Sequence, residues 1–145
     1  MPRPSTVVLI CHAEPQTSGT DPGLSAVGRK RAELLGFMFQ DAGVTAVFTS
    51  ELRRTQETAQ PLAARISVVP KVLLGLGTAA HRARILAISS GVALVIGRTN
   101  TVSPLIVALG VGNTVQIAAN EFDRMFLVAL HEAGGASLLS LRYRV

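Results

Sequence analysis

The sequence predicts an α/β fold in three layers, with a mostly parallel central sheet, helices on both of its faces and an antiparallel C-terminal edge. Short runs of Val, Ile, Leu and Ala without polar alternation recur along the chain, as in strands buried on both faces of a parallel sheet. Longer segments with helical periodicity separate these runs. The last two apolar runs instead flank a Glu-Ala-Gly-Gly turn, which is typical of a hairpin.

The first half of the chain predicts two strand–helix units. Apolar runs indicate strands over residues 6–10 and 44–49, and helices are expected over residues 24–41 and 51–65, with a Pro- and Gly-rich loop over residues 11–23. Ser25 is placed to cap the first helix, and Gly43 to end it. We expect that helix to bury one face, made of Val27, Ala32, Leu34, Leu35, Met38 and Phe39. We expect the second helix to bury Leu52, Thr55, Ala59, Leu62 and Ala63.

The second half predicts shorter elements. They are a strand over residues 66–69, an irregular stretch over 70–80, a helix over 81–89, a strand over 92–96, a helix over 102–109 and hairpin strands over 125–130 and 136–143. Pro104 is expected in the first turn of its helix, where its missing N–H costs little.

Composition limits the class of protein. The 145 residues are enough for one domain, 1–145, and they show neither a repeat nor a linker. A single cysteine, Cys11, excludes a disulfide framework and a Cys-rich zinc module. The net charge of +5, with 12 Arg among the 14 basic residues, suits an anionic partner. A basic stripe and stacking aromatics are both missing, so we expect no nucleic-acid partner.

Two apolar stretches invite a membrane interpretation. Residues 99–120 carry no charge or histidine, but they contain Asn100, Pro104 and Asn113, which are costly in hydrocarbon. Residues 85–97 are shorter than the ~20 that a spanning helix needs. The apolar run at residues 7–10 is too short for a signal peptide. We therefore expect a cytoplasmic protein with no membrane partner.

Polar residues follow three of the predicted strands. In an open α/β sheet, ligands bind outside the carboxyl ends of the strands. Here those ends deliver His12, Arg54 and Arg98. Guanidinium groups match phosphoryl oxygens two at a time, so this grouping favours a phosphoryl ligand.

The motifs at these strand ends resemble those of the histidine phosphatase family, the phosphoglycerate-mutase-like group, in its short form. The resemblance runs from residue 6 to about residue 110. The family's Arg-His-Gly-Glu reads Cys11-His12-Ala13-Glu14 here, and its Leu-Thr-x-x-Gly-x-x-Gln-Ala is echoed from Leu24 to Ala32. Its Ser-x-Leu-x-Arg-x-x-x-Thr-Ala box is matched at Ser50, Leu52, Arg54, Thr58 and Ala59. Its Gly-His loop corresponds to Gly97-Arg98.

The resemblance implies a role for each matched residue. His12 stands at the nucleophile that accepts the phosphoryl group, and Arg54 at a phosphate-binding arginine. Cys11 replaces the first arginine and is expected at the phosphate-binding site. Arg98 replaces the second histidine, and we expect it to act in catalysis and to bind the phosphoryl oxygens together with Arg54. Two of the four usual catalytic residues are therefore changed.

The general acid has several candidates. Because no Asp or Glu occurs between Glu57 and Glu121, the carboxyl that many family members draw from that segment is missing. Glu14 and Asp21 are candidates for an acid or a supporting group. The resemblance implies no cofactor, and His81 and His131 lack partners at metal-ligand spacing, so we expect no metal.

Two functions remain open. The first is hydrolysis of a phosphorylated small molecule or phosphoprotein through a phosphohistidine at His12, with impaired activity. The second is a catalytically inactive pseudo-phosphatase that binds phosphate or other anions, or a protein partner. A cysteine phosphatase is excluded, because its Cys-x5-Arg loop would need Arg where Thr17 stands.

Overall fold

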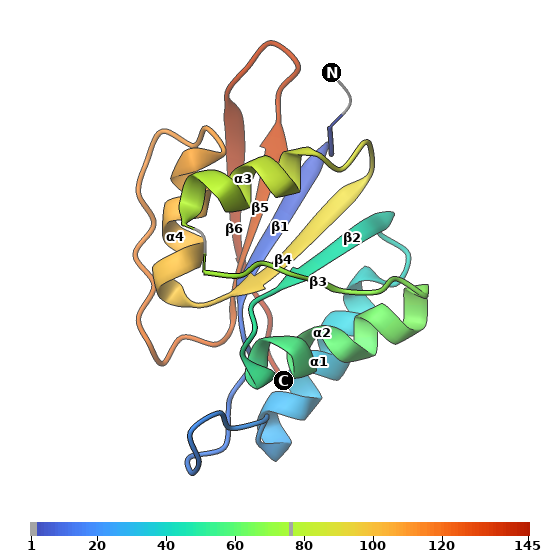
Figure 1. Ribbon diagram of the computed structural model, residues 1–145, viewed down its shortest axis with the longest axis vertical. Helices are drawn as coiled ribbons and strands as arrows, with labels where there is room; N and C mark the ends of the chain where they lie inside the picture. Colours follow the sequence, from blue (N-terminus) through green and yellow to red (C-terminus); the bar gives the residue numbers. More distant parts are fainter. Residues whose placement is uncertain (1–2, 76) are drawn as a thin grey trace.

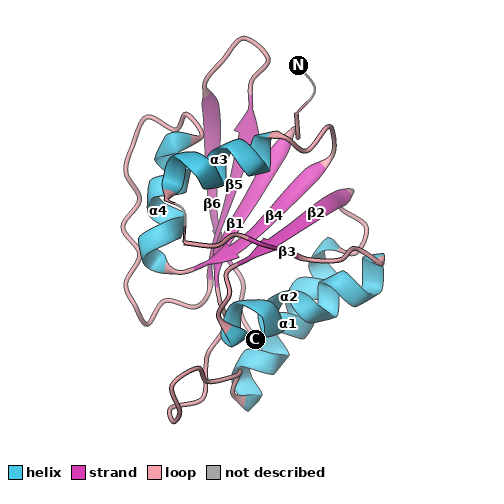
Figure 2. Cartoon of the chain, in the orientation of Figure 1, coloured by secondary structure: helices cyan, strands magenta, loops and turns pink. Residues whose placement is uncertain are grey.

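A six-stranded mixed sheet forms the middle layer, in the order β3-β2-β4-β1-β5-β6 (Figure 1). The computed structural model describes residues 3–75 and 77–145, so residues 1, 2 and 76 of the expected domain lie outside it. The elements are β1 Thr6–Cys11, α1 Ala26–Phe39, β2 Val44–Thr49, α2 Arg53–Ile66, β3 Lys71–Val72, α3 Thr78–Leu86, β4 Val92–Gly97, α4 Thr99–Ala108, β5 Arg124–Leu130 and β6 Ala136–Arg142. Figure 2 shows the helices and strands joined mainly by short loops, with a long one between α4 and β5.

The pairing confirms the predicted fold class. β1, β2, β3 and β4 run parallel to one another. β5 pairs antiparallel with β1, and β6 antiparallel with β5, which gives the expected C-terminal hairpin edge. The carboxyl ends of β1, β2 and β4 therefore meet at one edge of the sheet.

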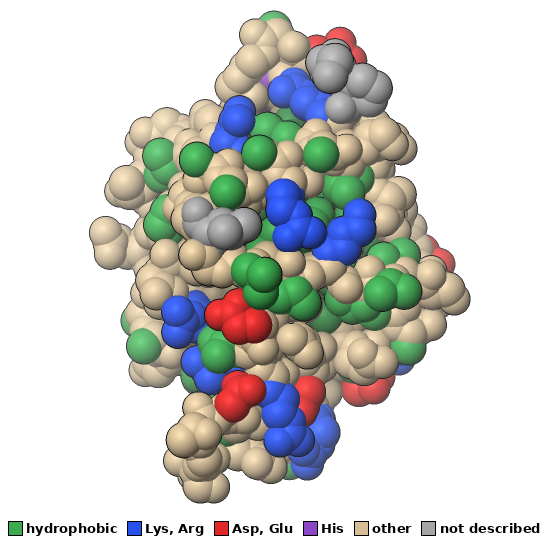
Figure 3. Space-filling model, viewed as in Figure 1, with side chains coloured by type: hydrophobic (Ala, Val, Ile, Leu, Met, Phe, Trp, Pro, Cys, Tyr) green, Lys and Arg blue, Asp and Glu red, His purple; other side chains and the backbone are tan. Residues whose placement is uncertain are grey.

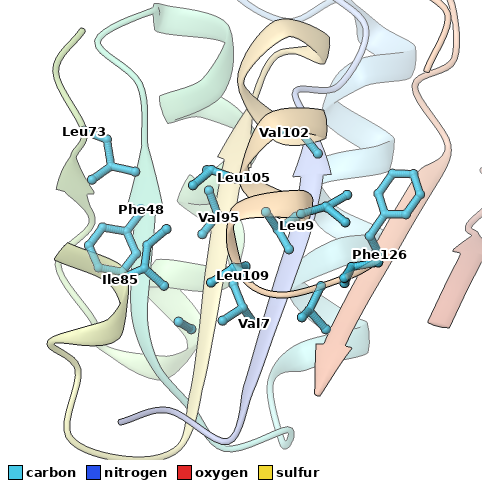
Figure 4. Packing of buried hydrophobic residues seen from close by; sticks show 14 of the residues in the cluster. Val7, Leu9, Phe48, Leu73, Ile85, Val95, Val102, Leu105, Leu109 and Phe126 are labelled. Atoms are coloured by element: carbon cyan, nitrogen blue, oxygen red, sulfur yellow. The ribbon is translucent and has the colours of Figure 1, made fainter. Parts of the chain in front are cut away.

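Both faces of the sheet are buried, as the unbroken apolar runs predict. Alternate residues of β1 enter opposite core clusters: Val7 and Leu9 face α3 and α4, whereas Val8 and Ile10 face α1 and α2. Figure 4 shows the first cluster, in which Leu9 and Val95 of neighbouring strands lie beneath α4. The two clusters give the three-layer architecture.

Helix α1 buries a different face from the expected one. Ser25 caps it as predicted, accepting from Gly28 N at 3.1 Å. However, Val27 and Met38 are 51% and 42% exposed. A Cβ on Gly36 would lie 3.2 Å from Leu62 N. The glycine therefore lets α2 approach closely, and the face that carries Gly36 is the buried one. The buried residues are Gly28, Arg31, Ala32, Leu35, Gly36 and Phe39.

Three predicted boundaries between α2 and α4 are wrong. The strand expected over residues 66–69 does not form, because α2 runs to Ile66 and then ends at Ser67 in a left-handed conformation. The strand is instead β3, inside the stretch expected to be irregular. Helix α3 begins at Thr78, three residues earlier than expected.

Helix α4 also begins earlier than predicted. It starts at Thr99, because Thr101 Oγ1 accepts from Arg98 N at 2.9 Å and closes the first turn there. Pro104 therefore lies beyond the first turn, contrary to the prediction. Within residues 3–75 and 77–145, no helix is both long enough and apolar enough to span a bilayer.

Candidate active site

The loops after β1 and β4 leave the sheet side by side. Cys11 and Gly97 are paired in the parallel register, and His12 N donates to Gly97 O at 3.0 Å. His12 and Arg98 thus follow directly from neighbouring strand ends. The sheet brings together residues that are far apart in the sequence, as predicted from the topology.

The His12 ring is held between two partners. Its Nδ1 lies 2.8 Å from Ala13 O, and Arg54 Nε donates to its Nε2 at 3.3 Å. This pattern assigns the proton to Nδ1 and the lone pair to Nε2. Burial, together with the charges of Arg54 and Arg98, lowers the pKa of His12 below its ordinary value of 6.5. The imidazole is therefore neutral at pH 7, with Nε2 able to act as a nucleophile.

Thr58 fixes the spacing between this imidazole and Arg54. Its Oγ1 accepts from Ala13 N at 2.9 Å and donates to Arg54 O at 2.7 Å. The side chain is fully buried, so both bonds are shielded from water. Thr58, the threonine of the Ser-x-Leu-x-Arg-x-x-x-Thr-Ala box, therefore joins the loop after β1 to the first turn of α2.

A pocket of about 250 Å³ opens beside the imidazole. Its lining residues are Cys11, His12, Arg98, Thr99, Asn100, Ala119, Glu121 and Phe122. Arg98 is exposed at its mouth. The Phe122 ring lies 5.9 Å from the imidazole, between ring centroids. Sequence reasoning missed Glu121 and Phe122, which come from the irregular segment before β5 and carry no motif.

Cys11 borders this pocket as a neutral thiol. Its side chain is 5% exposed, and burial raises its pKa to about 11. A neutral thiol is a weak hydrogen-bond donor and brings no positive charge. The wall of the pocket formed by β1 therefore lacks a cation of its own.

Glu14 is held as a carboxylate and is not suited to act as a general acid. Arg31 grips both carboxylate oxygens, with distances of 2.8 and 3.0 Å. These hydrogen bonds lower the pKa of Glu14. Asp21 is exposed, and its Oδ1 accepts from Arg53 N at 3.1 Å, at the start of α2. The structure thus places Glu14 as an anchor of the loop and Asp21 at the next helix.

Glu121 is likewise held as a carboxylate. Ala118 N donates to its Oε1 and Arg142 to its Oε2, each at 2.9 Å. These contacts lower its pKa. Among the residues the structure describes, no three His, Cys, Asp or Glu side chains gather as a metal site would require.

The chemistry of the arrangement is that of an oxyanion site. A neutral imidazole nitrogen faces one guanidinium and shares a pocket with another. Guanidinium N–H groups bind phosphoryl oxygens, and a histidine nitrogen can accept a phosphoryl group.

Comparisons with known proteins agree with this geometry. The family model described as histidine phosphatase superfamily (branch 1) matches residues 7–77, a span that includes His12 and Arg54. PE-PGRS family protein PE_PGRS11 of Mycobacterium tuberculosis (strain ATCC 25618 / H37Rv) is 41% identical over 61 residues, which are 41% of this chain. The matched segment spans only 10% of that relative.

Two solved structures share the fold over nearly the whole chain. The protein histidine phosphatase SixA complexed with tungstate superposes with a TM-score of 0.81 at 18% identity, covering 94% of this chain and 96% of that one. The mycobacterial glucosyl-3-phosphoglycerate phosphatase Rv2419c with inorganic phosphate gives a TM-score of 0.66 at 14% identity, covering 97% of each chain. The chain therefore has the fold of these two phosphatases, and the histidine phosphatase superfamily model matches just under half of its residues.

Proposed function

We propose that this protein hydrolyses phosphorylated substrates, phosphomonoesters or phosphoamides, through a phosphohistidine at His12. The observation that carries this proposal is the 3.3 Å contact from Arg54 Nε to His12 Nε2. It places a permanent cation beside the nitrogen that holds the lone pair. A bound phosphoryl group takes over that N–H donor, and the lone pair is then free to attack phosphorus.

The reaction proceeds in two balanced steps. His12 Nε2 forms a bond to phosphorus while the bond from phosphorus to the leaving oxygen or nitrogen breaks. The leaving group departs with the electron pair and takes a proton from water. The hydroxide left by this proton transfer then attacks phosphorus, the electron pair of the N–P bond returns to Nε2, and inorganic phosphate leaves while the neutral imidazole is regenerated. Arg54 and Arg98 stabilise the charge on the phosphoryl oxygens throughout.

The activity is lower than that of a site with all four usual groups. One missing oxyanion donor typically costs ~10²–10³ in kcat. The thiol of Cys11 supplies no such donor at pH 7, because burial raises its pKa to about 11. Arg98 keeps a positive charge at the place of the second histidine. The substrate is a phosphorylated small molecule or a phosphoprotein that reaches the 250 Å³ pocket from solvent.

The same features support a second candidate, an inactive pseudo-phosphatase that binds phosphate, other anions or a protein partner. The neutral Cys11 wall and the exposed Arg98 favour it, since both changes fall at the reacting centre. In this form Arg54 and Arg98 hold an anion, and no bond to His12 forms.

An aryl phosphate assay separates the two. Turnover that His12→Ala abolishes, in a protein that still folds, supports the enzyme. Binding of inorganic phosphate without turnover supports the second candidate. Turnover that persists unchanged in His12→Ala comes from a contaminant and contradicts the proposed mechanism. His131→Ala is the matched control, because His131 lies in the β5–β6 turn region, where its ring Nε2 hydrogen-bonds to Ser137 Oγ.

A further inference from the structure

Arg124 lies across from Cys11 on the neighbouring strand. The antiparallel register pairs Ile10 with Met125, so the next position sets Cys11 against Arg124. Both side chains lie on the α4 side of the sheet: Cys11 joins the core cluster of that face, and Arg124 stacks on the Phe126 ring of the same cluster at 4.9 Å. An arginine thus flanks the position where the resemblance places one.

The guanidinium of Arg124 is held loosely. It donates to Gln116 O at 3.2 Å, and to Glu121 Oε1 and Ser140 Oγ at 3.4 Å each. These distances lie at or beyond the long end of the usual N–H···O range. By contrast, Arg142 reaches its carboxylates at 2.9 and 3.0 Å. Little hydrogen-bond energy is therefore lost when the guanidinium of Arg124 changes partners.

Glu121 connects Arg124 to the pocket. It borders the pocket together with Cys11 and His12. Its carboxylate stays paired with Ala118 N and Arg142 when Arg124 moves away, so no anion is left without a partner. Arg124 is only 15% exposed, and in this setting its charge acts with less solvent screening than that of the exposed Arg98.

We propose that Arg124 supplies the cation that the Cys11 wall lacks, by turning from Glu121 to an oxygen of the phosphoryl group bound beside His12. The proposal rests on the proposed function, because it assumes that this pocket binds phosphoryl oxyanions. It makes Arg124 a ligand-binding residue contributed by β5, outside the motifs at the ends of the parallel strands.

Calorimetric titration with inorganic phosphate tests it. Arg124→Met should weaken binding at least tenfold, which equals about 1.4 kcal/mol. Arg82→Met removes the same charge from exposed α3 and should change the affinity less than twofold. Glu121→Gln should tighten binding, because it removes an anion from the pocket wall and frees Arg124, and this gain should be smaller in the Arg124→Met background, where only the loss of the anion contributes.

A double-mutant cycle separates binding from a structural role. In a Cys11→Arg background the missing guanidinium is restored, so Arg124→Met should have less than a threefold effect. An equal loss in both backgrounds would mean that Arg124 acts through the fold. If Cys11→Arg does not fold, the comparison of Glu121→Gln in the wild-type and Arg124→Met backgrounds still tests the role of Arg124.

The outcomes also distinguish this inference from the proposed function. Wild-type protein that binds no phosphate overturns the proposed function and this inference with it. Wild-type protein that binds phosphate, with Arg124→Met binding equally well, overturns only the role of Arg124.

Discussion

Arg54 Nε lies 3.3 Å from His12 Nε2, although 41 residues separate the two along the chain. The contact joins the first residue beyond β1 to the first turn of α2, and Thr58 holds both backbones in place. The same contact lowers the basicity of the imidazole and points its lone pair toward a cation.

The titration of His12 should depend on Arg54. Burial and then the nearby guanidinium charges lower the pKa of His12 below 6.5. In Arg54→Met the burial remains and one charge is lost, so the pKa should rise toward its ordinary value. NMR titration of the imidazole C–H signals measures it. Arg53→Met is the matched control, because Arg53 bonds to Glu57 and should leave the titration unchanged. A pKa in Arg54→Met equal to or below that of the wild type contradicts the pairing.

Restoring the two replaced groups should raise the rate. Cys11→Arg with Arg98→His returns the family's Arg-His pair and Gly-His loop, and each lost oxyanion donor is worth ~10²–10³ in kcat. We expect at least a tenfold gain in aryl phosphate turnover. The control is the double variant without the nucleophile, which should be inactive. A folded double variant with no gain would show that the crevice has diverged beyond these two positions.

Leaving-group chemistry should control turnover strongly. Arg31 holds Glu14 as a carboxylate, and Ala118 N and Arg142 do the same for Glu121, so neither is suited to protonate a leaving group at neutral pH. Nitrophenyl phosphate should therefore be hydrolysed more than ~10²-fold faster than an alkyl phosphate, the range that a positioned general acid usually contributes. Initial rates across a series of phenols of graded acidity provide the measurement. Rates that do not vary with the acidity of the leaving phenol would contradict this expectation and indicate a general acid outside Glu14 and Glu121.

The ion pair of Glu14 and Arg31 should stabilise the fold in a pH-dependent way. The folded-state pKa of Glu14 is lowered from 4.5, so the stabilisation is complete above that value and is lost as the pH falls through the folded-state pKa. Arg31→Met leaves a partly buried carboxylate without its partner and should cost about 3 kcal/mol at neutral pH. Urea unfolding at neutral and acidic pH tests both statements. The variant should lose less stability than the wild type on acidification, and an equal loss contradicts this role of the pair.

Sequence patterns predicted the layers well and the ends of elements poorly. The unbroken apolar runs of β1 and β4 and the β5–β6 hairpin appear where they were expected, because burial on two faces leaves a strong signal. Ile66 and Val69 also look like a strand, yet Ile66 ends α2 and Val69 is 82% exposed. Three apolar residues and a serine cannot distinguish a strand from a helix end when the next element decides the packing.

The residues of the candidate site were also predicted only in part. His12, Arg54 and Arg98 follow strand ends, so topology alone was enough to bring them together. Glu121, Phe122 and Arg124 lie at the end of a long loop and the start of an antiparallel strand, where no motif marks them. On the face shown in Figure 3, Lys and Arg side chains are spread over several elements and interleaved with acidic ones, so charge clustering gives no further guide.

The most direct test is to trap the phosphoenzyme. After rapid mixing with excess aryl phosphate and an alkaline quench, which preserves a phosphohistidine, peptide mass spectrometry should find one phosphoryl group per chain, on His12. The aryl alcohol should appear in a burst that matches it. Turnover without a phosphoryl group on His12, or with the group on another residue, would contradict the proposed role of this imidazole.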